Sequence, residues 1–205
     1  MIDVSEFQSE INWNKVKADG IEGTIIRCGY RGAEKGTLNE DKMFFNHIYG
    51  AYKAKLQVGI YMFTQAIDVK EAKEEAAYAL NMVKKASVLI DFPIAIDTEA
   101  VYYTKNGKRV GGRANGLSKA KRTEVIKAFC EEINRQGYEP MIYGSTSWLN
   151  NKLDMSKLPY DVWVAQYSSQ CEYKGKYLLW QYTSKGSVDG VKGNVDMNYY
   201  YEERK

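Results

Sequence analysis

Hydrophobic residues occur in two kinds of segment that alternate along the chain. Short runs rich in Val, Ile and aromatic residues, bounded by glycine or polar positions, are typical of buried β-strands. Longer stretches with an apolar residue at every third or fourth position are typical of helices that bury one face. The short runs predict strands over residues 1–4, 24–27, 58–63, 92–96, 141–143, 162–165, 178–182 and 195–198.

The helical spacing appears in four stretches, and capping residues mark two of their starts. The predicted helices cover residues 13–18 and 41–55, and two further helices begin at Asp68 and Ser118. Asp68 with Glu71 predicts a capping box, Ser118 predicts an N-cap, and Gly137 predicts the end of the last helix. Outside these stretches we expect a polar, glycine-rich loop over 103–116, a short connector containing Trp148 and Leu149, and no helix in the last two connections.

This order of elements predicts the fold class. Strands that alternate with helices pair in parallel, because neighbouring parallel strands need a crossover connection. We therefore expect an α/β fold, a modified (β/α) barrel with eight mostly parallel strands and fewer than eight helices. A full barrel takes about 250 residues, whereas this chain has 205. An open doubly wound sheet is the alternative, but no GxGxxG turn follows the first strand. The chain shows neither repeats nor a low-complexity linker, which predicts one domain over residues 1–205.

Composition narrows the classes of partner. Hydrophobic residues make up 44% and charged residues 27%, which is typical of a globular protein and not of a disordered one. The net charge of +3 is too small and too scattered for a nucleic-acid partner, although it suits an anionic surface such as a bacterial wall. No run approaches the roughly 18 apolar residues of a membrane span. The 17 tyrosines and 4 tryptophans supply flat rings with a polar edge, which sugar-binding clefts use.

The cysteines and the start of the chain bear on the compartment. Cys28, Cys130 and Cys171 are odd in number and irregularly spaced, which predicts free thiols and neither a disulfide framework nor a zinc site. The chain starts at Met1 without the basic and apolar regions of a signal peptide. We therefore expect either that an export signal has been removed or that the protein leaves the cell by another route.

Polar and aromatic residues recur where the predicted strands end. In parallel barrels these ends and the loops after them form the active-site face. The residues expected to meet there are Asp3, Arg27, Tyr30, Tyr61, Phe63, Asp97, Glu99, Tyr143, Gln166, Tyr167, Gln181, Tyr182 and Asp196. The candidate substrate contacts among them are Tyr61, Tyr143, Gln166, Gln181, Arg27 and Tyr30. Tyr61 and Tyr143 are preferred as sugar contacts, because strand alternation turns some of the other rings away from the cleft.

Asp97 and Glu99 are the strongest candidates for chemistry. Two residues apart in a strand, they point to one face at a backbone separation of about 6.6 Å. Two carboxyls this close raise one pKa, so that one of them can hold the proton that a departing glycosidic oxygen needs. An Asp-x-Glu pair is common at strand ends, and the other strand-end acids, Asp3 and Asp196, are what favour a site here. A metal is the other interpretation, but His47 is the only histidine and lies mid-helix, so we expect neither metal nor cofactor.

A set of short motifs spans nearly the whole chain. They are Ile2-Asp-Val-Ser5 with Gln8, Ile11-Asn-Trp13, Ile25-Ile-Arg27 with Gly29-Tyr30, Val58-Gly-Ile-Tyr61, Ala95-Ile-Asp-Thr-Glu99, Gly137-Tyr138, Ile142-Tyr143, Trp163-Val-Ala-Gln-Tyr167, Trp180-Gln-Tyr182 and Val195-Asp-Met-Asn198. Each motif is weak alone, and together, in this order, they are specific. In them the chain resembles the family-25 glycoside hydrolases, the Chalaropsis-type lysozymes found in bacterial autolysins and phage endolysins.

The resemblance implies an activity and a role for each acid. It implies a single glycoside hydrolase catalytic domain over residues 1–205, which cleaves the β-1,4 bond between N-acetylmuramic acid and N-acetylglucosamine in bacterial peptidoglycan. The expected location is extracellular, at the bacterial cell wall, and the expected state is monomeric. Glu99 is implied as general acid/base, and Asp97 as the residue that stabilises developing charge or orients the substrate's N-acetyl group. Asp3 and Asp196 are implied to shape the floor of the site.

The chain departs from the family's pattern at two places. Met1 stands where the family usually has Gly, and Met62-Phe63 replaces a more polar pair, which changes the expected contacts there. No wall-binding repeats follow Lys205, so we expect wall targeting to reside elsewhere. Carboxyl separations of about 5–5.5 Å and about 6.5–9.5 Å distinguish retaining from inverting enzymes, and side-chain rotamers reach both from this spacing. The Asp-x-Glu pair favours the third route, assistance by the substrate's own N-acetyl group.

Two other functions are compatible with these features. A non-catalytic wall-binding module could keep the barrel, although the presence of all four acids argues against it. A chitinase-like hydrolase acting on N-acetylglucosamine polymers is the second alternative.

Overall fold

Eight strands close into a barrel in the computed structural model, which describes residues 1–202. Around the ring they are β1 (Ile2–Val4), β2 (Gly23–Arg31), β4 (Gln57–Phe63), β5 (Ile94–Asp97), β8 (Pro140–Ser145), β9 (Asp161–Ala165), β10 (Leu179–Gly186) and β11 (Val195–Tyr200). The ring closes because β1 pairs with β2 on one side and with β11 on the other. The modified barrel predicted from the sequence is thus confirmed, and the open sheet is excluded.

The last strand runs against the other seven. β11 pairs antiparallel with both β10 and β1, whereas the pairs from β1 through β10 around the rest of the ring are parallel. Asp196 is therefore near the beginning of its strand and not at its carboxyl end, which corrects the strand-end argument for this residue. An antiparallel strand begins at the rim where its parallel neighbours end, so Asp196 still lies opposite Asp3.

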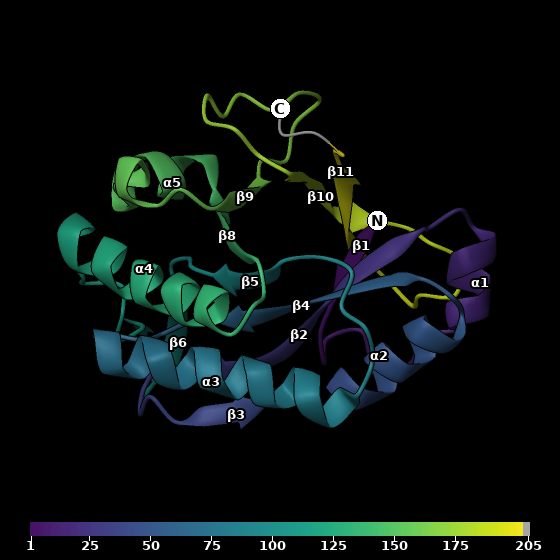
Figure 1. Cartoon of the computed structure of the whole chain (residues 1–205), viewed down its shortest axis with the longest axis horizontal. Helices are drawn as coiled ribbons and strands as arrows, with labels where there is room; N and C mark the ends of the chain where they lie inside the picture. Colours follow the sequence, from purple (N-terminus) through teal and green to yellow (C-terminus); the bar gives the residue numbers. More distant parts are fainter. Residues whose placement is uncertain (203–205) are drawn as a thin grey trace.

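Within residues 1–202, five α-helices lie outside the barrel (Figure 1). They are α1 (Trp13–Ala18), α2 (Phe44–Lys53), α3 (Val69–Ala86), α4 (Lys119–Arg135) and α5 (Thr146–Lys152). α3 and α4 run side by side along one side of the molecule, and β9, β10 and β11 lie on the other side, away from them. The predicted caps are present, since Asp68 Oδ1 accepts from the Glu71 main-chain N–H (2.9 Å) and Ser118 Oγ from that of Lys121 (3.2 Å). Among residues 1–202, none of these helices combines the length and the apolar character that crossing a membrane requires.

Two local expectations were wrong, and two short elements were not predicted. The connector after β8 is the helix α5, capped by Ser145 Oγ, which accepts from the Trp148 N–H (3.1 Å). The expected loop over 103–116 contains a hairpin of β6 (Tyr102–Lys105) and β7 (Lys108–Gly111), whose turn residues Asn106 and Gly107 have φ of 50° and 73°. Asn-Gly is the pair that such a two-residue turn requires. A short strand, β3 (Leu38–Glu40), adds to the edge of β2, and a 3-10 turn, η1 (Met155–Lys157), precedes β9.

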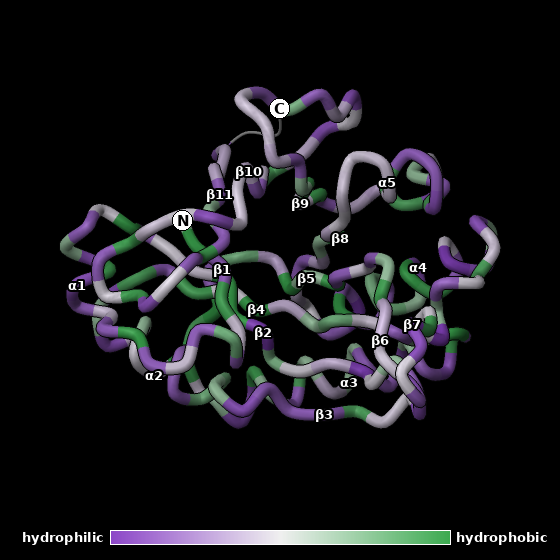
Figure 2. The backbone as a smooth tube through the Cα atoms, turned by 180° about the vertical axis from the view of Figure 1, so that it is seen from behind, coloured by the Kyte–Doolittle hydropathy of each residue, from purple (hydrophilic) through white to green (hydrophobic). Residues whose placement is uncertain are grey.

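Strand alternation divides the core into two layers. The barrel interior is filled by side chains that include Ile25, Tyr61, Ala95, Met141, Tyr143, Trp163 and Leu179. Their neighbours along the strands, such as Ile60, Ile142 and Val162, face the helices. Figure 2 shows the most hydrophobic backbone on central strands such as β1, and paler or hydrophilic backbone along the hairpin β6–β7. The interior rings pack edge to face, with Trp163 centred 4.6 Å from Tyr143 and 6.0 Å from Tyr61, and they form a solid floor for whatever lies at the rim.

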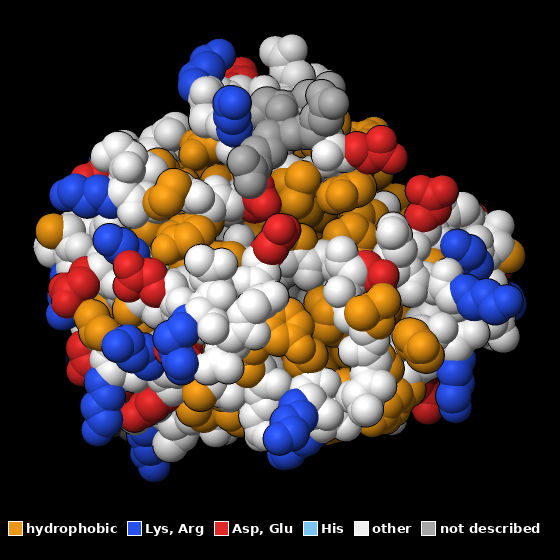
Figure 3. All heavy atoms as spheres, viewed as in Figure 1, with side chains coloured by type: hydrophobic (Ala, Val, Ile, Leu, Met, Phe, Trp, Pro, Cys, Tyr) orange, Lys and Arg blue, Asp and Glu red, His pale blue; other side chains and the backbone are white. Residues whose placement is uncertain are grey.

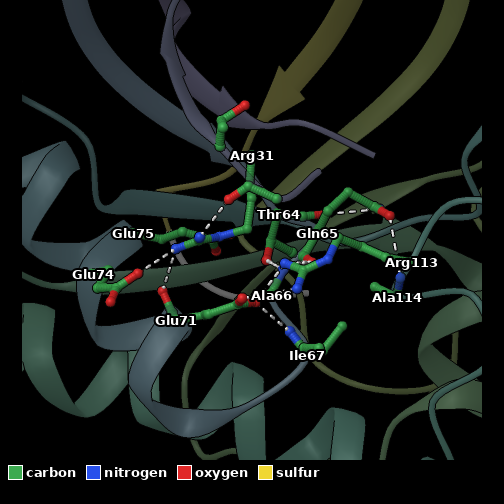
Figure 4. A network of polar contacts seen from close by, with 12 residues as sticks. Arg31, Thr64, Gln65, Ala66, Ile67, Glu71, Glu74, Glu75, Arg113 and Ala114 are labelled. Carbon is green, nitrogen blue, oxygen red and sulfur yellow. Dashed lines mark hydrogen bonds and ion pairs between the residues drawn. The ribbon is translucent and has the colours of Figure 1, made fainter. Parts of the chain in front are cut away.

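A polar network joins the end of β2, the helix α3 and the segment that follows the hairpin (Figure 4). Arg31 Nε donates to Glu75 Oε1 (2.8 Å) and its Nη2 donates to Glu74 Oε2 (3.1 Å). Arg113 donates from Nη1 and Nη2 to the two carboxylate oxygens of Glu71 (2.6 and 2.8 Å). Because Arg31 Nη2 also donates to the main-chain carbonyl of Glu71 (3.0 Å), the segment bearing Arg113 is held through α3 to the barrel.

We expect Arg31→Met to lower the free energy of unfolding by about 3–5 kcal/mol near pH 8, because Glu75 is fully buried and would lose its cation. Burial raises the pKa of Glu75 to about 7, against the opposing effects of Thr64 and Arg31. A carboxyl whose folded pKa lies above its unfolded value costs stability as the pH rises between the two. The loss in the variant should therefore be smaller near pH 5 than near pH 8, as measured by denaturant unfolding.

The matched control is Lys121→Met, which removes an exposed ion pair with Glu124 on α4. This variant should change the free energy of unfolding by less than about 0.5 kcal/mol at either pH. Equal losses for the two variants would contradict the assignment of Arg31 as the cation of a buried pair.

Candidate active site

A cavity of about 480 Å³ opens at the rim where β1, β2, β4 and β5 end. Its walls come from those strand ends, from the turn after β1 and from β11: Asp3, Val4, Ser5, Glu6, Phe7, Gln8, Arg27, Tyr30, Tyr61, Phe63, Asp97, Glu99 and Asp196. The four acids singled out from the sequence thus line one cavity. Asp3 and Asp97 are buried, Asp196 is half-buried, and Glu99 is exposed at the mouth.

Asp3 is held by two amide side chains from the last two strands. Gln181 Nε2 and Asn198 Nδ2 both donate to Asp3 Oδ2 (2.9 and 2.8 Å). The amide oxygens are fixed in turn, since the Tyr143 hydroxyl donates to Gln181 Oε1 (2.9 Å) and Trp163 Nε1 donates to Asn198 Oδ1 (2.7 Å). An indole N–H can only donate, so Trp163 sets which end of the Asn198 amide faces Asp3. The barrel interior therefore turns two N–H donors toward one carboxylate.

The electrostatics of Asp3 result from opposing effects. Burial, followed by the charge of Asp196, raises the pKa of Asp3 to about 7. The hydrogen bonds from Asn198 and Gln181 lower that pKa, because donors stabilise the charged form. Asp3 is thus poised to change its charge near neutral pH.

The segment Asp97–Thr98–Glu99 is fixed from several sides. The Thr64 N–H donates to the Asp97 main-chain carbonyl (2.9 Å), and the Thr98 N–H donates to the carbonyl of Tyr143 (3.2 Å). Trp148 Nε1, from α5, donates to the Thr98 hydroxyl (3.1 Å). These contacts hold the backbone between the two acids, so both reach the same cavity although β5 ends at Asp97.

Both acids of this pair hold their protons more tightly than free carboxyls do. The pKa of Asp97 lies well above its ordinary value because of burial, then the charges of Glu99, Asp3 and Asp196, with Arg27 opposing. The pKa of Glu99 is raised by loss of water near the protein walls and then by Asp196. Because Glu99 keeps contact with solvent at the mouth, it can exchange a proton with a bound molecule. Asp97 Oδ1 is buried and has no hydrogen-bond partner among the described residues.

The candidate substrate contacts divide into three groups. Tyr61, Arg27 and Tyr30 line the cavity. Tyr143 and Gln181 are buried beneath it and act on Asp3, as described above. Gln166 lies apart from the cavity, where its Oε1 accepts from the Thr146 hydroxyl (2.7 Å) and from the Glu172 N–H (3.1 Å). Sugar contact by any of these residues stays a prediction.

The sequence did not identify four residues that shape the site, which are Glu6, Asp41, Asn198 and Trp148. Arg27 Nε donates to the fully buried Asp41 (2.7 Å) and its Nη2 to Glu6 (3.0 Å). Asn198 appeared only within a motif, and Trp148 was placed in a connector. Asp41 precedes the first turn of α2, and an acidic residue at that place is common because it interacts favourably with the helix N-terminus. Only the Asp41 side-chain contacts reveal its role, since it also accepts from the Glu6 N–H (2.9 Å) in the turn after β1.

Charged side chains of both signs lie on the surface of the protein. On the face seen in Figure 3, acidic side chains lie among hydrophobic ones near the centre, and lysine, arginine and further acidic side chains are interspersed around the periphery. In the chain as a whole positive charge is in slight excess.

The chain is similar to one known protein family over most of its length. The family model described as glycosyl hydrolases family 25 matches residues 2–191. An autolytic lysozyme of Clostridium acetobutylicum is 25% identical over 202 residues, which are 98% of this chain and 55% of the relative. Lysozyme M1 of Streptomyces globisporus is 28% identical over 209 residues, with 97% of this chain and 66% of the relative covered.

A solved structure has the same fold. The modular autolysin LytC from Streptococcus pneumoniae matches with a TM-score of 0.83 at 28% identity, over 98% of this chain and 46% of that chain. The chain therefore spans about half to two thirds of the length of the curated relatives, 55% and 66%, and less than half of this solved structure.

The raised pKa of Asp3 yields a prediction. After burial, the charge of Asp196 is the largest contribution that raises this pKa, so Asp196→Asn should lower it. A carboxyl ¹³C NMR titration of Asp3 in the two proteins measures the change. Asp189→Asn, which removes an exposed acid outside the cavity, is the control and should leave the Asp3 titration unchanged. An Asp3 pKa that is the same in D196N and in the parent protein would refute the electrostatic coupling across the cavity.

Proposed function

The chain belongs to family 25 of the glycosyl hydrolases, and from this we propose that it is a lysozyme that hydrolyses bacterial peptidoglycan. The bond proposed for cleavage is the β-1,4 bond between N-acetylmuramic acid and N-acetylglucosamine. The observation that carries the proposal is the cavity in which Asp3, Asp97, Glu99 and Asp196 converge. Relatives named as an autolytic lysozyme and a modular autolysin support the wall as the substrate. We further propose that residues 1–205 act as one catalytic domain, outside the cell at the bacterial wall.

Glu99 is the proposed general acid. Its pKa is raised by desolvation and then by Asp196, so Glu99 keeps its proton to a higher pH than a free carboxyl does. Its exposure at the mouth lets that proton reach a bound glycosidic oxygen. Once the leaving group has departed, the Glu99 carboxylate can accept a proton from the attacking water. The same group thus serves as acid and then as base.

Asp97 is the proposed partner of the substrate's N-acetyl group. Its Oδ1 is buried at the cavity and unpartnered among residues 1–202, and a buried acceptor of this kind gains from a donor such as an amide N–H. Holding that amide aims its carbonyl oxygen at the anomeric carbon, which favours the substrate-assisted route over direct attack by an enzyme carboxylate. Asp3 and Asp196 complete the negative field that stabilises the cationic transition state.

Digestion of purified peptidoglycan tests the activity directly. We expect the protein to release soluble fragments whose new reducing ends are N-acetylmuramic acid, identified after borohydride reduction. Reducing ends of N-acetylglucosamine would contradict the proposed bond and support the chitinase-like alternative. Binding to the wall without release of fragments would support the non-catalytic module.

Replacement of Glu99 tests the acid. Glu99→Gln keeps the shape of the side chain and removes its proton, so the rate of fragment release should fall by at least about 10²–10⁴-fold. Because the side chain is exposed, the melting temperature should stay nearly unchanged. Glu124→Gln on the exposed face of α4 is the matched control and should retain full activity. Substantial activity in E99Q would remove Glu99 from the acid role.

A further inference from the structure

Phe7 is a large apolar side chain that the fold leaves in solvent at the mouth of the cavity. It is 80% exposed and lines the same cavity as Asp97 and Glu99. Single exposed apolar residues are ordinary on protein surfaces, and Leu89, which is 74% exposed, is one on this protein. Phe7 differs from Leu89 because of where it lies and how firmly its backbone is held.

The turn that carries Phe7 is closed by hydrogen bonds on both sides of the residue. The Gln8 N–H donates to the Ser5 carbonyl (3.0 Å), and the Ser5 N–H donates to Gln8 Oε1 (3.1 Å). The Glu6 N–H donates to the buried Asp41 carboxylate (2.9 Å). Underneath, His47 Nε2 lies 3.2 Å from the Ser5 carbonyl oxygen, which can only accept, so the imidazole donates to it. A turn fixed at this many points presents its side chain in one position.

The Phe7 ring also has a fixed neighbour on one side. The Arg27 guanidinium lies 5.2 Å from the centre of the Phe7 ring and 5.1 Å from that of Tyr30. Arg27 is itself held by Asp41 and Glu6. A cation held against an aromatic ring restricts the ring at little cost, because the interaction does not require the ring to be buried. The ring is therefore oriented without being covered, which is what a stacking surface for a ligand needs.

The order of strands in the barrel places Phe7 and Tyr167 on opposite sides of the acidic residues. β5, which carries Asp97 and leads into Glu99, stands opposite β11, which carries Asp196. The turn after β1 lies on one of the two arcs between them, and the end of β9, followed by Tyr167, lies on the other. Tyr167 is 58% exposed, and its hydroxyl donates to Gln181 Oε1 (2.9 Å). A chain that runs from Phe7 to Tyr167 thus passes between Glu99 and Asp196.

We propose that Phe7 is a substrate-binding residue, an aromatic surface on which one sugar ring of the glycan strand stacks at the β1–β2 end of the cleft. The C–H faces of a pyranose ring match the face of an aromatic ring, and pockets for such ligands combine rings with a few fixed polar groups. This inference rests on the proposed function, because it takes the glycan of that reaction as the ligand. It adds the direction in which the strand crosses the cavity.

Kinetics on soluble peptidoglycan fragments test the role of the ring. Phe7→Ala should raise KM by about ten-fold and change kcat little, because a contact remote from the cleaved bond contributes mainly to uniform binding. Phe7→Trp should keep KM near that of the parent protein, whereas Phe7→Leu, which retains apolar surface without a ring, should behave like Phe7→Ala. An unchanged KM in both F7A and F7L would overturn the proposal.

Stability and a surface control separate binding from folding. The melting temperature of F7A should equal that of the parent protein, since the side chain buries little surface. Leu89→Ala removes an apolar side chain of similar exposure from the loop between α3 and β5, at the opposite end of the barrel. It should leave KM unchanged, and an equal rise of KM in L89A would also overturn the proposal.

A binding measurement keeps this proposal distinct from the proposed reaction. Calorimetric titration of E99Q with a tetrasaccharide of alternating N-acetylglucosamine and N-acetylmuramic acid measures affinity without turnover. The double variant F7A/E99Q should bind about ten-fold more weakly than E99Q. This holds even if the parent protein releases no fragments, in which case the proposed reaction fails and the proposed contact stands. Equal affinity of the two variants, or no binding by E99Q, would refute the role of Phe7.

Discussion

The carboxyl group of Asp3 is buried beside other acids, and it is tolerated there because two amide N–H groups meet it from β10 and β11. The side chains that orient these amides, Tyr143 and Trp163, also fill the interior of the barrel. Packing and electrostatics are therefore supplied by the same residues. A smaller ring at either place would open a void and release an amide from its orientation.

The acids along the cavity form a gradient of solvent contact. Asp3 and Asp97 lie deepest, Asp196 is half-buried and Glu99 is at the mouth. Burial raises each pKa, and the charges of neighbouring acids raise most of them further, so protons are retained in the cluster near neutral pH. Concentrating like charges in a poorly solvated place lowers the stability of the fold, and active sites commonly carry this cost. The network around Arg31 and Glu71 stiffens the neighbouring segment without entering the cavity.

The spacing of hydrophobic residues and the order of the predicted elements made the barrel and its four acids predictable from the sequence. Short runs of β-branched and aromatic residues identified all eight barrel strands, and Asp3 and Asp97 lie at or next to the ends of β1 and β5. Glu99 follows β5, and Asp196 lies near the beginning of β11, so the expected strand-end position was wrong for Asp196 although it reaches the same cavity. The direction of β11 was not predictable, because a six-residue apolar–polar strand reads the same in either direction. Likewise Asp41 and Asn198 act through contacts with residues far away in the chain, and no local pattern records such contacts. The α5 helix was missed because its seven residues contain too few apolar positions to show a period.

The pairing of β1 with β11 has a consequence for the order in which the protein is made. Asp3 emerges from the ribosome first among the acids, and its partner Asn198 follows 195 residues later, together with Asp196. Contacts between residues this far apart in the sequence form late, because the whole intervening chain must be ordered or looped before they meet. Until then β1 has only β2 beside it, and the cavity lacks one wall. The strand that completes the cavity is thus the last of the barrel strands to be made, so a polypeptide that has not yet reached β11 carries the Asp97–Glu99 pair without the wall that bears Asp196.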